Sequence, residues 1–168
     1  MSIKKLVPGL TVALLLAAPV SVHAQDALVT FKSLSPELAL DLARAALGEC
    51  RKLGYQAAVA VVDRFGVTQV VLRDRFAGAH TPGTAVGKAW TAVSFRTNTT
   101  DLVAASKEGT PQSAVRNLPG AVVLGGGIMV EAGGAMVGGV GVSGGPGGDA
   151  DDACAKAGIE AVRDKLDF

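Results

Sequence analysis

The glycine-rich stretch 135–148, AMVGGVGVSGGPGG, constrains the fold more than any other part of the sequence. Its alternating valines favour a strand, and the glycines between them leave room for a neighbouring backbone or helix to approach closely. The glycines around Pro146 predict a sharp turn. Acids from Asp149 onward predict a helix start, because a helix N-terminus favours negative charge. We therefore expect a strand, a glycine turn and a helix that reaches Leu166.

Two familiar motifs overlap in this stretch, and neither predicts a site. Gly139-x-Gly141-x-x-Gly144 matches the dinucleotide fingerprint, which requires a second parallel strand after the helix. Too little chain follows to supply that strand, so we expect no nucleotide cofactor. Gly141-x-Ser143-x-Gly145 matches a nucleophile elbow, but in that fold the catalytic histidine follows the serine, and no histidine follows here.

Residues 1–24 have the pattern of a cleaved signal peptide. Lys4 and Lys5 precede an apolar run over 10–18, and a small-residue cleavage site comes next, which places the start of the mature chain at Gln25. The alternative is an uncleaved membrane anchor, for which the run is short. We expect a periplasmic or secreted protein with no membrane span in the mature chain.

Charge and cysteine content restrict the function classes. The formal net charge of +1 falls to about −1 without the two leader lysines, and no basic run is present, so we expect no nucleic-acid partner. Export permits a disulfide between Cys50 and Cys154, whose long spacing is not that of metal ligands. Two separate buried thiols are the alternative.

The rest of the chain predicts helices that alternate with strand pairs. Residues 25–33 form a loose or edge segment, and Ser35 with Pro36 is a strong helix start. The expected helices are 36–53, 81 to 96–98, 100–107 and 149–166, and the expected strands are 57–62, 67–72, 121–124, 128–131 and 135–143. Because hairpins predominate, we predict one α+β domain over 34–168, without repeats, built on a mainly antiparallel sheet.

Several short motifs, taken in order, resemble a known family. They are Val62-Asp63-Arg64-x-Gly66, Gly78-Ala79, Lys88-Ala89-x-Thr91-Ala92, Leu118-Pro119-Gly120, Gly125-Gly126 and Gly139-Val140-Gly141-Val142-Ser143-Gly144-Gly145. Together they resemble the haem-degrading HbpS/GlcG family, which also includes the C-terminal domain of PduO proteins. The sequence departs from the family in one loop, where Arg75-Phe76-Ala77-Gly78-Ala79 lacks the acid of the usual Arg-x-Asp-Gly-Ala.

The resemblance implies a profilin-like fold, with a five-stranded antiparallel sheet and helices on both faces. It also implies a homo-oligomer, often an octamer, that binds haem or a related tetrapyrrole, and for some members a sensor-kinase partner. In such a fold the first and last helices lie side by side. That arrangement would bring Cys50 and Cys154 within disulfide distance.

The candidate site residues lie around the charged loop 73–80. His80 is the only histidine of the predicted mature chain and is the candidate haem-iron ligand, with an exposed loop histidine as the alternative. Arg75 and Lys88, with Arg73, are candidates to meet haem propionates, with a solvated basic loop as the alternative. Lys88 lies off the apolar face predicted for its helix. Thr99 is a candidate through the resemblance alone.

The functional hypothesis is an exported oligomeric haem-binding protein that stores, senses or degrades haem. A ligand-free accessory or sensory partner of a periplasmic system and an enzyme on a small metabolite are the alternatives. Asp149, Asp151 and Asp152 suggest a cation site, but calcium needs more oxygen ligands, so we interpret them as helix N-terminal acids. No catalytic residue is predicted, and an enzyme here would depend on a cofactor for its chemistry.

Overall fold

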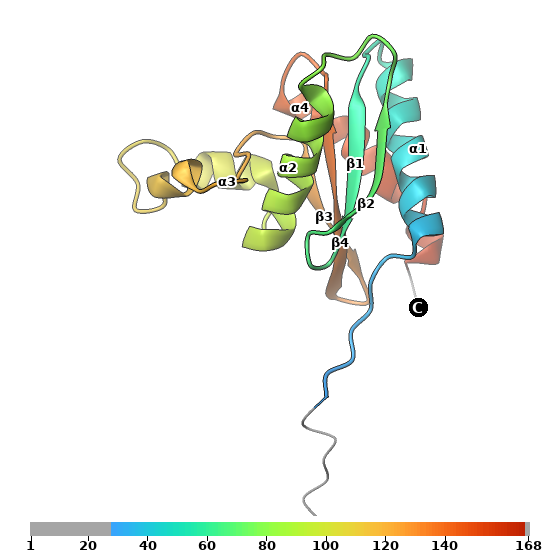
Figure 1. Cartoon of the computed structure of the whole chain (residues 1–168), viewed down its shortest axis with the longest axis horizontal. Coiled ribbons are helices and arrows are strands. Elements are labelled where there is room, and N and C mark those ends of the chain that lie inside the picture. Colours follow the sequence, from blue (N-terminus) through green and yellow to red (C-terminus); the bar gives the residue numbers. More distant parts are fainter. Residues whose placement is uncertain (1–27, 167–168) are drawn as a thin grey trace, which may run out of the picture. The chain divides into compact units, whose positions relative to one another are not determined.

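The computed structural model describes residues 28–166, and its fold lies in the unit Lys32–Phe168 (Figure 1). The predicted signal peptide and the start at Gln25 lie outside the described residues. The helices are α1 (Pro36–Lys52), α2 (Thr81–Phe95), α3 (Thr99–Ala105) and α4 (Gly148–Glu160), with short 3-10 helices at Ser113–Asn117 (η2) and Arg163–Lys165 (η3). The strands are β1 (Ala58–Asp63), β2 (Thr68–Arg73), β3 (Gly127–Ala132) and β4 (Ala135–Ser143). No helix among the described residues is long and apolar enough to cross a membrane.

The sheet has the order β2-β1-β4-β3, and every pair of neighbours is antiparallel. This confirms the predicted α+β class with an antiparallel sheet. Glycine-rich β4 lies between β1 and β3, with Gly141 opposite Ala60 on one side and Gly127 on the other. The strand predicted to be the most constraining element is therefore central to the sheet.

The expected fifth strand, 121–124, is absent from the described sheet, which has four strands. This segment lies on α2 instead, because Val122 N donates to Thr91 Oγ1 at 2.8 Å. A Cβ at Gly87 would lie 2.4 Å from the Val122 side chain, so the glycine in α2 makes the close approach possible. A hydrogen bond to a helix side chain thus replaces a bond to a strand.

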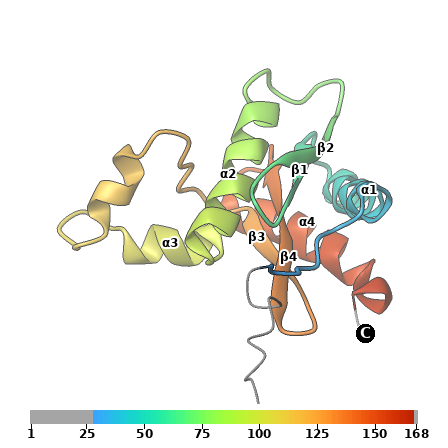
Figure 2. The same cartoon turned by 60° about the horizontal axis from the view of Figure 1, so that its bottom comes forward.

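Helices cover both faces of the sheet (Figures 1 and 2). On one face α1 and α4 lie side by side and enclose the larger core, which includes Val59, Val61, Val130, Val140 and Val142. On the other face α2 crosses β4 and β1. The distance from α2 is so short that a Cβ at position 141 would lie 2.0 Å from the carbonyl oxygen of Ala85, so only glycine fits there.

The first helix has the ends that the sequence predicts. Ser35 Oγ accepts from Leu38 N at 3.2 Å, and Gly54, with φ +84°, stops the helix. The next residue completes this C-terminal motif, because Tyr55 N donates to Cys50 O at 2.8 Å. These contacts fix where α1 ends.

The last helix differs from its prediction. Instead of continuing to Leu166, α4 ends at Glu160 and the chain goes on as η3. Val162 has φ −119°, outside the helical range, and its side chain is buried. Burial of Val162 and Leu166 in the core therefore bends the chain away from the helix axis.

The segment with α3 and η2 stands away from the sheet in both views. It contacts the rest of the domain mainly at its base, where Asn98 and Thr99 bond to β3.

Candidate functional site

A cleft of about 570 Å³ opens beside the start of α2 and the start of α4. One wall is the loop before α2, with Phe76, Gly78 and His80, together with Thr84 of α2. The opposite wall has no side chains over much of its length, because it consists of glycines at 125, 144, 145, 147 and 148. Lys88 and Asp151 also line the cleft.

Lys88 and Asp151 form a buried ion pair at this position. Lys88 Nζ donates to Asp151 Oδ2 at 2.7 Å and to the carbonyl oxygen of Val142 at 2.9 Å, and the two side chains are 4% and 6% exposed. The sequence places Lys88 off the apolar face of α2, and the structure shows that this residue is buried all the same. A carboxylate from α4, distant in sequence, satisfies the ammonium group and so permits its burial.

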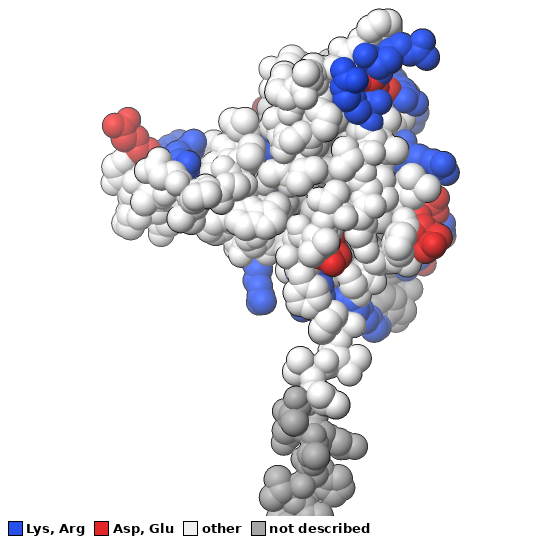
Figure 3. All heavy atoms as spheres, viewed as in Figure 1, with Lys and Arg blue, Asp and Glu red and all other residues white. Residues whose placement is uncertain are grey.

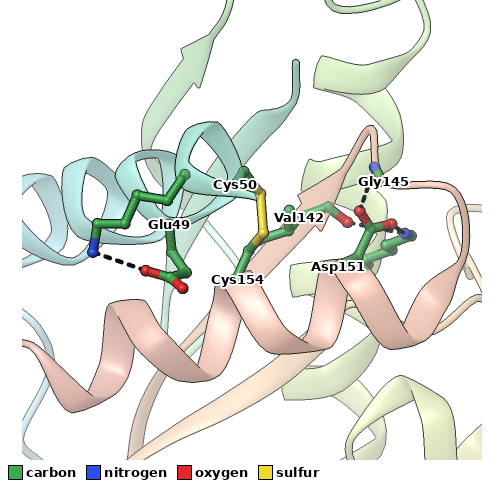
Figure 4. Close-up of a disulfide and its surroundings, with 8 residues drawn as sticks. Glu49, Cys50, Val142, Gly145, Asp151 and Cys154 are labelled. Carbon is green, nitrogen blue, oxygen red and sulfur yellow. Dashed lines mark hydrogen bonds and ion pairs between the residues drawn. A yellow bond between two sulfur atoms is a disulfide. The ribbon is translucent and has the colours of Figure 1, made fainter. Parts of the chain in front are cut away.

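Two acids near the start of α4, Asp151 and Asp152, hold the glycine segments in place. Asp151 Oδ1 accepts from Gly145 N at 2.8 Å, a contact that Figure 4 shows beside the disulfide. Asp152 Oδ1 accepts from Gly126 N at 2.6 Å, and its Oδ2 accepts from Thr100 Oγ1 at 2.7 Å. Each carboxylate thus satisfies backbone N–H groups that glycines leave accessible.

Sequence reasoning missed this role of the two acids. It interpreted them as helix N-terminal acids, and Asp151 does lie in the first turn of α4. Both are nevertheless buried, with 4% and 7% of the whole residue exposed, and both accept from specific donors. The available signal was two adjacent acids shortly after a glycine turn, where backbone N–H groups outside regular structure need acceptors. Among the described residues, no group of three or more His, Cys, Asp or Glu could hold a metal ion.

His80 lies at the mouth of the cleft, exposed to solvent, directly before α2. Its ring packs against the Cα of Gly78, where an added Cβ would lie 2.8 Å from the imidazole. Arg75 is exposed in the same loop but does not line the cleft. The structure therefore brings His80 and Lys88 to one cavity and places Arg75 beside it.

Thr99 and Arg73 lie elsewhere. Thr99 is fully buried, and its Oγ1 accepts from Gly127 N at 2.8 Å and donates to Gly127 O at 3.3 Å. With Asn98 Oδ1, which accepts from Met129 N at 3.1 Å, it caps the edge strand β3. Arg73 donates to the carbonyl oxygen of Ala77 and lines a different hollow, next to α1.

The loop that carries Phe76 and His80 is tied to α1 at its start. Asp74 is 5% exposed, and its Oδ1 accepts two hydrogen bonds from the guanidinium of Arg51, that from Nε at 2.8 Å. The hydrogen bonds and the charge of Asp74 raise the pKa of Arg51. The second oxygen, Oδ2, is buried without a hydrogen-bond partner. This contact sets where the loop leaves β2.

Cys50 Sγ and Cys154 Sγ are bonded, with the Cα atoms 5.3 Å apart (Figure 4). The bond joins α1 to α4 across 104 residues of sequence. It lies one residue before Arg51 on α1 and one turn after Asp151 on α4.

Comparison with protein families identifies the group. Residues 34–160 match the model of the haem-degrading HbpS-like proteins. The chain belongs to this family. The matched range contains the whole cleft and both cysteines, whereas the predicted signal peptide and the segment 25–33 lie outside it.

Solved structures of family members have the same fold. A double mutant of HbpS from Streptomyces reticuli is 39% identical, with a TM-score of 0.76, and the match covers 87% of this chain and 97% of that one. A PduO C-terminal domain in complex with haem is 30% identical, with a TM-score of 0.71, over 77% and 94% of the two chains. ORFY of Klebsiella pneumoniae, 23% identical with a TM-score of 0.77 over 80% and 94%, shares the fold. No curated protein matches the chain.

Proposed function

We propose that this protein is exported and binds haem or a related tetrapyrrole in the cleft beside His80. The observation that carries the proposal is the cleft itself, which combines a bare glycine wall with an accessible imidazole at its mouth. Membership of a haem-degrading family and the similarity to a domain solved with haem support it.

The residues of the cleft fit a flat, largely apolar macrocycle. The volume of the cleft, about 570 Å³, lies within the usual range for ligand pockets. Glycines along one wall leave a surface without side chains, against which a planar ring can lie. Phe76 and Leu124, which are 79% and 55% exposed, supply apolar surface at the cleft. Exposed apolar side chains around a cleft are typical of a ligand site.

Each residue has a defined part in this proposal. His80 offers an imidazole nitrogen, a common ligand of haem iron, and Arg75 offers a guanidinium to a propionate from the neighbouring loop position. Lys88 is already paired with Asp151, so its proposed part is to fix the position of the cleft wall. Its positive charge adds a weaker attraction for a haem propionate. When bound, haem supplies the iron chemistry.

A hemin titration of the purified mature protein tests the proposal. We expect a saturable Soret change, and a weaker or shifted band in His80→Ala. Arg75→Gln should weaken binding without a change of band position, since it contacts no iron. Gln112→Ala, an exposed change on the segment with α3 and η2, is the control and should bind as the unmodified protein does.

The outcomes separate the alternatives. An identical spectrum and affinity in His80→Ala would remove this residue from the site while haem binding stands. Saturable binding with unchanged affinity in both His80→Ala and Arg75→Gln would remove both residues from the haem site. No hemin binding at all would favour an accessory or sensory partner of a periplasmic system.

Export, assembly and the finer fold assignment also belong to the proposal. We propose cleavage before Gln25, a periplasmic or secreted location, a homo-oligomer of up to eight copies and a profilin-like arrangement of the domain. Mass spectrometry of exported protein that finds Met1 intact would contradict the cleavage. Light scattering that finds only monomer would contradict the oligomer.

A further inference from the structure

A second hollow, of about 400 Å³, lies between α1 and the end of β2, and three arginines surround it. Its lining residues are Arg44, Leu47, Arg51, Leu72 and Arg73. Arg44 and Arg51 are two turns apart on α1, and so share a face of that helix. Figure 3 shows blue side chains gathered at this end of the molecule, over the ends of α1 and β2. We call this feature the arginine hollow.

The arginine hollow carries unbalanced positive charge. Arg51 is paired with Asp74. Among the described residues, neither Arg44 nor Arg73 forms an ion pair with a carboxylate. Asp41, whose pKa the charge of Arg44 helps to lower, is already bonded to Lys165 at 2.9 Å. Within the described part of the chain, two guanidinium groups therefore have no ion-pair partner, beside a third that has one.

Two of the three guanidinium groups are held by the fold. Arg73 Nη2 donates to the carbonyl oxygen of Ala77, and Arg51 donates through Nε and Nη2 to Asp74. Each guanidinium has five N–H donors, so most of the donors around the hollow stay available. Between the arginines, Leu47 is buried and Leu72 is half-buried, which gives the hollow an apolar floor.

We propose that the arginine hollow binds a small oxyanion of two or more negative charges, a phosphate compound or a di- or tricarboxylate. Arginine pairs with phosphate and carboxylate through two parallel hydrogen bonds, and several arginines around one concavity favour a multivalent anion. The volume of the hollow lies within the range for small-molecule sites. Its residues are distinct from those of the glycine-walled cleft, so the inference does not depend on haem binding.

Calorimetric titration with pyrophosphate and with citrate tests this inference, with acetate at equal ionic strength as the monovalent reference. Pyrophosphate or citrate should bind with a dissociation constant well below that of acetate. Arg44→Gln and Arg73→Gln should each weaken that binding about tenfold, the loss of one charge-assisted contact. Both side chains are exposed, so both variants should fold, which circular dichroism checks.

The control variant is Arg163→Gln, an exposed arginine with a 57% exposed side chain that does not line the hollow. Its affinity for either anion should equal that of the unmodified protein. Equal weakening in all three variants would reveal attraction by net charge alone and overturn the site. Unchanged affinity in Arg44→Gln and Arg73→Gln, or no binding of either anion at about 10 mM, would also overturn it.

Discussion

The buried pair of Lys88 and Asp151 gives the most demanding test of the structure. The change Lys88→Met keeps a long apolar side chain in α2 but removes the ammonium. Asp151 Oδ2 and the carbonyl oxygen of Val142 then lose their donor inside the protein. Because the two charged side chains are only 4% and 6% exposed, solvent replaces this donor poorly. Removal of one partner of such a pair costs about 3–5 kcal/mol.

Removal of both charges should cost less. In Lys88→Met with Asp151→Asn, the side-chain amide keeps an oxygen to accept from Gly145 N and gains an N–H₂ group to donate. No charge stays buried. We therefore expect Lys88→Met to be less destabilising in this background than alone, by about 2 kcal/mol. Asp151→Asn alone leaves the ammonium without a counter-charge and should also be destabilised.

Urea unfolding of the four proteins, followed by circular dichroism with the disulfide intact, measures these free energies. For a domain of this size, a loss of 3–5 kcal/mol lowers Tm by roughly 10 °C. The control is Lys107→Met, an exposed lysine on the segment with α3 and η2, which should stay within about 0.5 kcal/mol of the unmodified protein. A loss below about 1 kcal/mol in Lys88→Met, or additive effects in the double variant, would show that the pair is not closed to water.

Three further predictions follow from packing, cross-linking and charge. Gly141→Ala should lower the free energy of unfolding in urea by about 3 kcal/mol or more, because the added Cβ meets the backbone of α2. Its control, Gly48→Ala, lies in open space on α1 and should raise that free energy by about 0.5–1 kcal/mol; equal effects of the two changes would contradict the close approach at position 141. Mature oxidised protein should show no free thiol in denaturant, and loss of the disulfide, with its 104-residue separation, should cost about 4–5 kcal/mol; two free thiols per chain would contradict the bond. The hydrogen bond and charge of Lys165 lower the pKa of Asp41 from 3.8, so the stability from this exposed pair is present above that pH and is lost as pH falls through the lower folded-state pKa. In low salt, Asp41→Asn should therefore reduce the acid-side slope of the unfolding free energy against pH, and an unchanged slope would exclude the pair.

Local rules predicted most elements, because their signals lie within a few residues. The Ser35 cap and the stop at Gly54 fix α1, and the alternation over 135–143 fixes β4 with its exact bounds. The strand prediction for 121–124 was wrong because its apolar residues suit a strand, yet its backbone bonds to Thr91 of α2. Periodicity cannot report which partner a short apolar segment finds.

The site was less predictable than the fold, for a physical reason. The apolar face predicted for α2 does not include Lys88, and the sequence did not indicate its burial, because its counter-ion comes from a residue 63 positions later. Thr99 was chosen by resemblance, and its hydroxyl bonds to Gly127 of an edge strand. Contacts between residues so far apart depend on tertiary packing, which local patterns do not encode.

The two walls of the cleft depend on the same pair of helices. Cys50 and Arg51 are adjacent on α1, and Arg51 fixes Asp74, where the loop with His80 begins. On α4, Asp151 lies one turn before Cys154 and fixes the glycine turn of the opposite wall. Because the disulfide joins the two helices at these points, it restrains one wall of the cleft relative to the other. The cleft is thus anchored from both sides before any ligand arrives, which lowers the conformational entropy that binding must otherwise remove.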